Sequence, residues 1–219
     1  MTLSEMKGML KGSLNIAVVS TAKYFMPYIL GAYRDKYENI KISLKVTDRN
    51  EVKDMLRNNL CDLAVFSVLP DELDLESVDF LSNQLMIASA PDHPLAKEKN
   101  IDFKALEEYD FLIREPGSGT RMVMQHLFDK YDISPNIIME LGTNEAVKQA
   151  IMAGIGISLI SKYSLTLEEG IGKISIVEVK DLPYENVWKI VYPKGKRLSP
   201  AAQNFIEFTV NAPINEILT

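Results

Sequence analysis

The sequence predicts an α/β protein built from two lobes, each with the order strand, helix, strand. Short apolar runs typical of buried strands alternate along the chain with stretches whose apolar residues recur at helical spacing. The same order starts again after a break at Pro91-Asp-His-Pro94, which we interpret as the crossing into a second lobe. Strands that alternate with helices pair in parallel through right-handed crossovers, so we expect mainly parallel sheets.

The first lobe opens with a continuous apolar run, which favours a strand buried on both faces. Asp48 and Glu51 have the spacing of a capping pair for a short helix. The elements expected in this lobe are a strand over 14–19, a helix over 22–37, a half-exposed strand over 41–47, a short helix after Asp48 that bears Val52, Met55 and Leu56, a strand over 63–66, an acidic loop over 70–79 and a strand over 85–90.

The second lobe repeats this logic. The glycines of Ala153-Gly-Ile-Gly156 suit a left-handed turn at a helix end. The elements expected after the crossing are a short helix over 101–108, a strand over 111–113, a helix from Ser118, a strand over 136–141, a helix from Thr143, strands over 157–160, 174–179 and 187–192, and a final helix capped by Ser199. The last strand would return to the first lobe. Residues 3–11 read as a short helix, and 211–219 as a poorly ordered tail.

Composition excludes several classes of function. The net charge of −6 argues against holding nucleic acid across the whole surface. The apolar runs are too short to span a bilayer, and the N-terminus lacks the apolar region of a secretory signal. Cys61 is the single cysteine, and its apolar neighbours indicate a buried structural thiol. His93 and His126 lack metal-ligand spacing, so we expect no metal site and no cofactor.

One strand-to-helix junction has the residues of an anion receptor. Ser118 and Thr120 open a helix directly after a buried strand, and a helix start offers unpaired N–H groups and the positive end of the helix dipole. Gly117 and Gly119 would let a ligand approach the backbone, and Arg121 adds donors suited to a carboxylate or phosphate. The alternative is an ordinary turn whose arginine faces water.

A second junction of this kind follows the first strand. Ser20 and Thr21 end that strand, and Lys23 lies in the first turn of the next helix, where the dipole disfavours a cation. A bound anion would explain this lysine, and a solvated lysine is the alternative. Ser67 follows another buried strand. Ligands bind at the carboxyl ends of such parallel strands, where Ser20, Thr21 and Ser67 all fall.

Five segments together carry a resemblance to a known family. They are Gly12-Ser-Leu-Asn-Ile-Ala-Val-Val-Ser-Thr21, Asp62-Leu-Ala-Val65, His93-Pro-Leu95, Arg114-Glu-Pro-Gly-Ser-Gly-Thr-Arg121 and Ala153-Gly-Ile-Gly-Ile-Ser158. In their order and spacing they resemble the effector-binding domain of LysR-type transcriptional regulators. Val19-Ser-Thr-Ala-Lys-Tyr-Phe25 is similar to the subgroup that controls carbon-fixation genes.

The resemblance implies a periplasmic-binding-protein-like fold (type 2) of two Rossmann-like lobes joined by two crossing strands. It places lobe I at 12–86 plus 192–210, lobe II at 87–191, the end of a linker region at 1–11 and a tail at 211–219. A small anionic effector would bind in the cleft between the lobes. The ligand-binding positions are then Ser20, Thr21, Lys23, Ser67, Ser118, Thr120, Arg121, and Thr143 or Asn144. For Arg114 we expect a structural pairing with Glu115 or another acid, with the ligand as the alternative.

The resemblance also implies partners. Family members bind DNA through an N-terminal winged helix-turn-helix, which this sequence lacks, and associate as dimers of dimers. We therefore expect a cytoplasmic, non-enzymatic homodimer that associates through lobe I, with a helix of one chain antiparallel to a strand of the next. Two alternatives share the fold: a solute-binding protein of a transporter, and an enzyme similar to prephenate dehydratase, which Thr120-Arg121 slightly supports.

Overall fold

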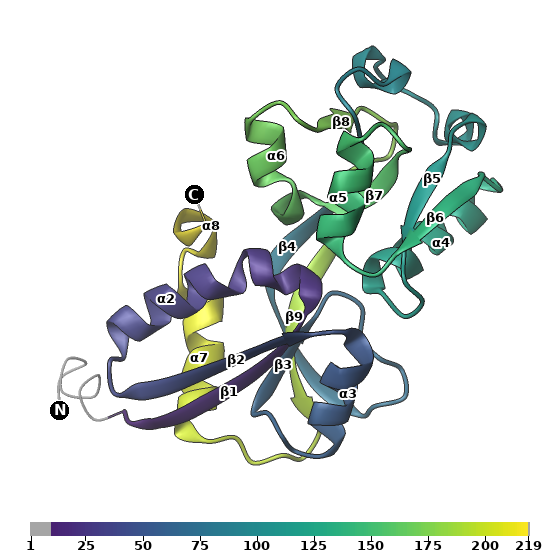
Figure 1. Ribbon diagram of the computed structural model, residues 1–219. Helices are drawn as coiled ribbons and strands as arrows, with labels where there is room; N and C mark the ends of the chain where they lie inside the picture. The colour runs from purple at the N-terminus through teal and green to yellow at the C-terminus, as the bar shows by residue number, and fades with distance from the viewer. Residues whose placement is uncertain (1–9, 219) are drawn as a thin grey trace. The chain divides into compact units, whose positions relative to one another are not determined.

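A computed structural model describes residues 10–218, which form two compact units (Figure 1). Unit 1 holds the described residues up to Leu81 and from Val187 onward, and unit 2 is Ser82–Asn186. The boundaries fall inside two strands, β4 (Leu75–Ser89) and β9 (Tyr184–Pro193). Both strands run through these boundaries without a break, so no turn residue in the sequence marks where one unit ends and the other begins. From the sequence we expected the boundaries at 86/87 and 191/192.

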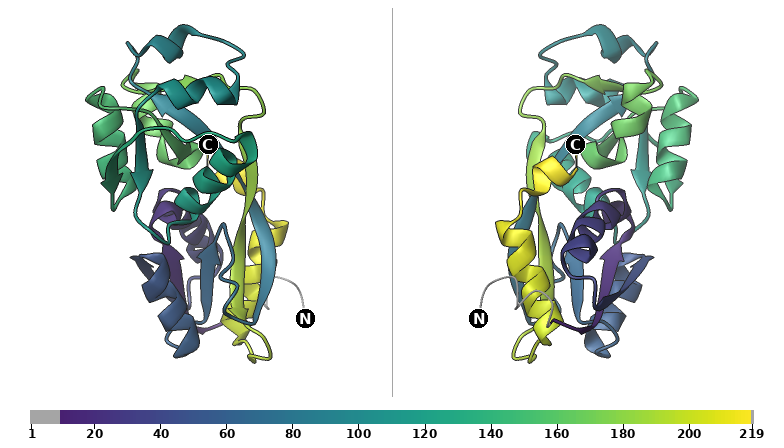
Figure 2. Two further views of the ribbon diagram at one scale, coloured as in Figure 1. Left: turned by 90° about the vertical axis from the view of Figure 1, so that its right-hand side faces the viewer. Right: turned by 90° about the vertical axis from the view of Figure 1, so that its left-hand side faces the viewer.

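Unit 1 is a sheet with helices against it. β1 pairs in parallel with β2 and β3, as predicted, whereas β3 pairs antiparallel with the returning strand β9. Besides β9 and the first part of β4, unit 1 consists of β1 (Gly12–Val19), the 3-10 helix η1 (Ser20–Tyr24), α2 (Met26–Lys36), β2 (Ile40–Thr47), α3 (Arg49–Arg57), β3 (Leu63–Phe66), α7 (Pro200–Asn211) and α8 (Ile214–Ile217). Figure 2 shows the strands of unit 1 between α3 and α7.

Unit 2 repeats the strand–helix order. β5 pairs in parallel with β6, and a parallel bridge from Phe111 to Ile157 joins β5 to the segment entering β7. β4 pairs antiparallel with β7 and β8. The elements of this unit are η2 (Pro94–Lys97), η3 (Phe103–Glu108), β5 (Phe111–Arg114), α4 (Gly119–Tyr131), β6 (Ile137–Leu141), α5 (Asn144–Met152), β7 (Ser158–Ser161), η4 (Lys162–Ser164), α6 (Thr166–Gly170) and β8 (Ser175–Val177).

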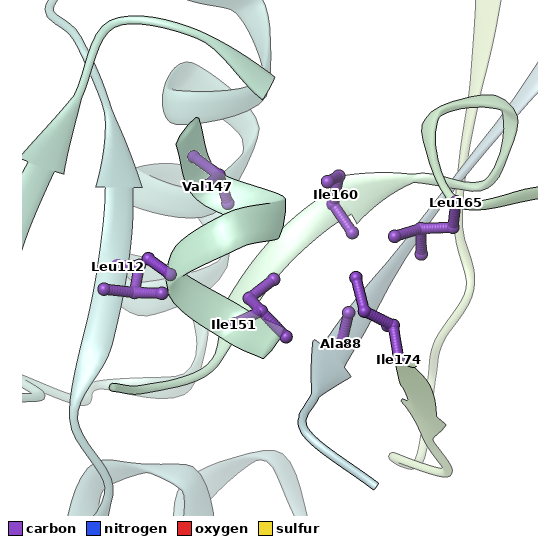
Figure 3. Packing of buried hydrophobic residues seen from close by; sticks show 8 residues of the cluster. Ala88, Leu112, Val147, Ile151, Ile160, Leu165 and Ile174 are labelled. Atoms are coloured by element: carbon purple, nitrogen blue, oxygen red, sulfur yellow. The ribbon is translucent and has the colours of Figure 1, made fainter. Parts of the chain in front are cut away.

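Each unit has its own apolar core. In unit 2, side chains of α5 pack between those of the strands and of the segment before α6 (Figure 3). This cluster comprises Ala88, Leu112, Val147, Ala150, Ile151, Ile160, Leu165 and Ile174. Burying a side chain of leucine or isoleucine size contributes about 1.5–3 kcal/mol, so the cluster fixes α5 firmly on its sheet.

In unit 1, α3 packs on β1 and β3 through a cluster that includes Val52, Leu56 and Cys61. Cys61 is buried there, which confirms the prediction of a structural thiol. A second group of contacts is aromatic: Phe25 lies 5.0 Å from Trp188, centroid to centroid, and the Tyr33 hydroxyl donates to the Ala201 carbonyl. The first contact packs the start of α2 on β9, and the second joins α2 to α7.

Four expectations about elements were wrong. The predicted loop over 70–79 contains the first part of β4, because Glu76 and Asp79 lie on a strand whose side chains there are largely exposed. The helix expected from residue 22 starts at Met26, after η1. The helix over 101–108 is the 3-10 helix η3. The predicted tail contains α8, which α2 contacts and in which Ile214 is buried. The expected helix over 3–11 falls almost entirely outside the described residues.

Candidate functional site

The start of α4 presents unpaired hydrogen-bond donors. Pro116-Gly117 turns the chain after β5, with Gly117 in the left-handed region at φ +88°. Within the described chain, the N–H groups of Gly119, Thr120 and Arg121 donate to no protein acceptor. Ser118 makes no capping hydrogen bond, although Ser118 and Thr120 are both only 8% exposed. The hydroxyls of these two buried residues and the unpaired helix N–H groups together form a receptor suited to an anion.

Arg121 has structural partners. Its Nη1 donates to the carbonyl oxygen of Arg114 at 2.9 Å and to Glu140 Oε2 at 2.5 Å. These contacts join the first turn of α4 to β5 and β6. Arg121 is therefore paired with an acid, Glu140, and is not directed at water alone.

The start of α5 is organised differently. Thr143 is exposed, and its Oγ1 accepts from the N–H of Ala146 at 3.1 Å, which caps the helix. Asn144 is buried, and its Nδ2 donates to Ser164 Oγ at 3.3 Å. Its Oδ1 accepts from Arg114. The Asn144 side chain is thus occupied by internal hydrogen bonds, and Thr143 is the more accessible member of the pair.

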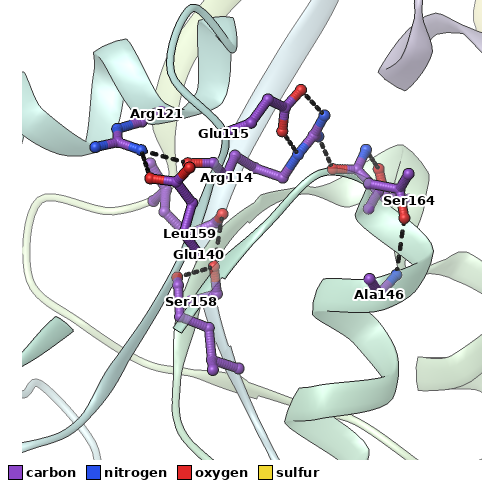
Figure 4. A network of polar contacts seen from close by, with 11 residues as sticks. Arg114, Glu115, Arg121, Glu140, Ala146, Ser158, Leu159 and Ser164 are labelled. Carbon is purple, nitrogen blue, oxygen red and sulfur yellow. Dashed lines mark hydrogen bonds and ion pairs between the residues drawn. The ribbon is translucent and has the colours of Figure 1, made fainter. Parts of the chain in front are cut away.

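Arg114 is a buried cation whose guanidinium is paired with the neighbouring acid, Glu115. It is 3% exposed, and its guanidinium forms a two-point contact with Glu115, with Nε to Oε2 at 2.6 Å and Nη2 to Oε1 at 2.8 Å (Figure 4). Nη1 donates to Asn144. The structural pairing of Arg114 with Glu115 is confirmed.

In unit 1, the predicted residues lie at one edge of the sheet. The register pairs Val19 with Thr47 and Val18 with Val65, so Ser20 and Ser67 both follow the carboxyl ends of adjacent parallel strands. Ser20, Thr21 and Lys23 belong to η1. Because η1 is a short 3-10 helix, its dipole is weaker than that of the α-helix expected there. The Lys23 ammonium lies 5.1 Å from the centroid of the Tyr24 ring.

Arg49 belongs to the same edge, and the sequence analysis missed it. Its Nη1 donates to the Val68 carbonyl at 2.5 Å, and its guanidinium lies 5.2 Å from the centroid of the Phe66 ring, so it is held beside Ser67. Burial lowers the pKa of Arg49, and the nearby acids Glu72 and Asp71 oppose that shift. An arginine stays charged under these conditions. Arg49 is a cation two residues beyond the end of the parallel strand β2, and this position is the sequence signal that could have identified it.

The structure therefore brings the predicted residues into two groups. Unit 1 gathers Ser20, Thr21, Lys23 and Ser67, to which it adds Arg49. Unit 2 gathers Ser118, Thr120, Arg121, Thr143 and Asn144, since β5 and β6 pair up to Arg114 and Leu141. Both groups follow the carboxyl ends of parallel strands and consist of donors, so each suits an anionic ligand. Among residues 10–218 no group of three His, Cys, Asp or Glu side chains could hold a metal ion.

Comparison with known proteins identifies the family. Residues 7–213 match the LysR substrate binding domain. The chain belongs to the LysR substrate-binding domain family. The HTH-type transcriptional activator CmpR of Synechocystis sp. (strain ATCC 27184 / PCC 6803 / Kazusa) is 39% identical over 206 residues, which are 94% of this chain and 68% of that protein. The RuBisCO operon transcriptional regulator of Allochromatium vinosum is 38% identical over 209 residues, 95% of this chain and 69% of the regulator.

Solved structures agree with this assignment. The CcmR regulatory domain of Synechocystis PCC6803, determined in complex with 2-PG, is 40% identical with a TM-score of 0.87, over 91% of this chain and 96% of that one. The effector binding domain of QuiR, in complex with shikimate, is 22% identical with a TM-score of 0.82 and shares the fold. The fold of this chain is therefore the α/β, periplasmic-binding-protein-like (type 2) fold that the sequence predicted.

The chain is thus the effector-binding domain of a LysR-type transcriptional regulator. Its resemblance to carbon-fixation regulators is confirmed, because relatives include RuBisCO operon regulators and CbbR of Rhodospirillum rubrum. The relatives are named transcriptional regulators, which favours this reading over a solute-binding protein or a dehydratase. No helix in the described part of the chain has the length and apolar character needed to cross a membrane.

Proposed function

We propose that this LysR-family domain senses a small anionic metabolite of the 2-PG kind, with the start of α4 as its main anion receptor. The observation that carries the proposal is that the hydroxyls of two buried residues, Ser118 and Thr120, lie beside three unpaired helix N–H groups. The CcmR regulatory domain, 40% identical, was solved in complex with 2-PG. A ligand at such a helix start gains charge-assisted hydrogen bonds, and it replaces the water that otherwise satisfies these donors.

The remaining donors complete the proposed ligand-binding set. Thr143 supplies a hydroxyl at the start of α5, and Asn144 holds that helix in place. In unit 1, Ser20, Thr21 and Ser67 supply hydroxyls or backbone donors, while Lys23 and Arg49 supply positive charge. We propose that each of the two groups can bind an anion and that no residue of either group performs catalysis. Arg121 acts indirectly, by holding the first turn of α4 against β5 and β6.

The output is transcriptional. Relatives are HTH-type regulators. We propose that effector binding to this domain changes the arrangement of the DNA-binding domains of its own full-length regulator in the cytoplasm. The effector can act as a switch only if it prefers one state of the domain. A tenfold change in population needs about 1.4 kcal/mol of differential binding free energy.

Thr120→Val tests the receptor. Valine keeps the shape of threonine but removes the hydroxyl, so the affinity for 2-PG should fall by about tenfold or more. At a ligand concentration 100-fold above Kd, binding stabilises the native domain by about 2.7 kcal/mol, and a tenfold loss of affinity removes about 1.3 kcal/mol of that. Thermal shift measures the difference.

Thr166→Val is the matched control, because Thr166 is an exposed threonine at the start of α6. It should keep the wild-type response to 2-PG. An equal ligand-induced stabilisation in Thr120→Val and wild type would show that α4 is not the receptor.

We also propose a homodimer in which α2 of unit 1 in one copy packs antiparallel to a strand of the second copy, giving a tetramer in the full-length regulator. Tyr28 on α2 is 62% exposed, and Val46 on β2, an edge strand of the same unit, is 38% exposed. In the described part of the chain β2 pairs only with β1. A symmetric dimer would use each of these surfaces twice.

Sedimentation velocity tests this arrangement. Tyr28→Glu and Val46→Glu should each shift the domain toward monomer, because each places a charge in an apolar contact. Ile138→Glu is the control, since Ile138 is 38% exposed on β6, a strand of unit 2. Dissociation by Ile138→Glu alone would place the interface at β6 instead.

A further inference from the structure

The Arg114 guanidinium joins segments that follow three strands of unit 2. Arg114 ends β5, Asn144 follows β6 and Ser164 follows β7, and hydrogen bonds run from Arg114 to Asn144 and from Asn144 to Ser164 (Figure 4). A buried guanidinium is costly unless its charge is paired, and the paired charge here is Glu115. The position of Glu115 is therefore set by Arg114.

Glu115 lies close to the proposed receptor. Its carbonyl oxygen accepts from the N–H of Ser118 at 3.2 Å, and its own N–H donates to the Leu141 carbonyl at 3.1 Å. These backbone bonds keep residue 115 within one turn of the unpaired N–H groups of α4. Its side chain is 30% exposed. A carboxylate free to move at this place would repel an anion at the helix start, or would occupy the same N–H groups itself.

We propose that Arg114 is a positioning residue that keeps the Glu115 carboxylate from opposing an anion at the start of α4. The two-point contact at 2.6 and 2.8 Å neutralises the acid and directs both of its oxygens at the guanidinium. The bond that Arg114 Nη1 donates to Asn144 Oδ1 fixes the guanidinium from the other side, and Arg121 Nη1 donates to the Arg114 carbonyl at 2.9 Å. The anion receptor of unit 2 thus depends on an arginine that need not touch the ligand. This inference rests on the proposed function.

A rescue experiment separates this role from a purely structural one. Arg114→Met should weaken 2-PG binding by about 10- to 100-fold, the range found when a residue that orients a metal ligand without touching the metal is lost. The double variant Arg114→Met/Glu115→Gln should regain most of that affinity, because it no longer carries the opposing charge. Isothermal titration calorimetry gives the dissociation constants. A double variant as weak as Arg114→Met would overturn the proposal.

Further variants keep the test decisive. If Arg114→Met does not fold, Arg114→Lys keeps the charge but loses the two-point contact, and Arg114→Lys/Glu115→Gln should bind more tightly than Arg114→Lys alone. Arg57→Met is the control, because Arg57 pairs with Asp54 on the surface of α3. It should leave 2-PG affinity unchanged.

Amide hydrogen exchange adds a measurement that needs no ligand. Arg114→Met should alter exchange across residues 116–121, because Glu115 becomes free to contact the N–H groups of α4, and Glu115→Gln should remove most of that change. Unchanged exchange in Arg114→Met would refute the positioning role. Wild-type domain that fails to bind 2-PG would instead refute the proposed effector class, while the exchange result would still decide the role of Arg114.

Discussion

Replacing Lys148 with methionine should destabilise unit 2 strongly. Lys148 lies on α5, and its Nζ is 2.8 Å from Glu168 Oε1 on α6. The two side chains are only 7% and 13% exposed, and Glu168 Oε2 is buried without a hydrogen-bond partner. A second acid, Glu145, is 3.8 Å from Nζ but half-exposed. Lys148→Met therefore leaves one carboxylate in the interior without its counter-charge.

The expected magnitude follows from this burial. Removing one partner of a buried ion pair costs about 3–5 kcal/mol, whereas replacing both partners is often close to neutral. Glu168 retains slight access to water, so Lys148→Met should lie near about 3 kcal/mol. The double variant Lys148→Met/Glu168→Gln should recover most of this loss. For a domain with an m-value of about 2 kcal/mol/M, the single variant shifts the urea midpoint by roughly 1.5 M.

Urea unfolding followed by circular dichroism measures these values. Lys180→Met is the matched control, because Lys180 and Asp102 are 3.8 Å apart with side chains 55% and 66% exposed. Such a surface pair contributes about 0–1 kcal/mol. The reasoning is refuted if Lys148→Met costs no more than Lys180→Met, or if the double variant is less stable than Lys148→Met.

Three further predictions concern other sites. Gly156→Ala should cost about 1–3 kcal/mol, because its Cβ would lie 2.6 Å from the Asp110 carbonyl oxygen, while Gly142→Ala, with open space around it, should be nearly neutral in the same denaturation assay. Tyr33→Phe should cost about 1–2 kcal/mol of unfolding free energy, since it removes a buried hydroxyl that is hydrogen-bonded to the α7 backbone. Burial raises the pKa of Cys61 to about 11. Its thiol should react with Ellman's reagent at pH 8 only on unfolding, and its contribution to stability, complete below the ordinary pKa of 9.0, should be lost as the pH rises toward 11.

The sequence predicted those features that depend on local pattern. Continuous apolar runs identified the buried strands β1, β3 and β5, and hydroxyls at strand ends identified both groups of donors. The pairing of Arg114 with Glu115 was accessible because the two residues are neighbours. In contrast, the start of β4 was missed, since its acidic residues face outward and conceal the strand pattern.

Contacts between distant segments could not be read in the same way. Arg121 meets Glu140 only because β5 and β6 pair in one particular register, with Arg114 beside Leu141. Asn144 is turned inward by Arg114 and Ser164, which come from two other strand ends. Arg49 reaches the edge near Ser67 through a bond to the Val68 carbonyl. Each of these contacts can be inferred only when the pairing of the strands is already known.

The course of β4 and β9 has a consequence for biosynthesis. Unit 2 is one continuous segment, Ser82–Asn186, inserted into unit 1, whose strand β9 and helix α7 come from the end of the chain. A ribosome therefore releases all of unit 2 before it releases the residues that cover Tyr33 and pair with β3. Residues 10–81 therefore remain only partly buried while the inserted unit is being translated. Chaperone contacts during synthesis should accordingly concentrate on β1, α2 and β3 and end once α7 has emerged.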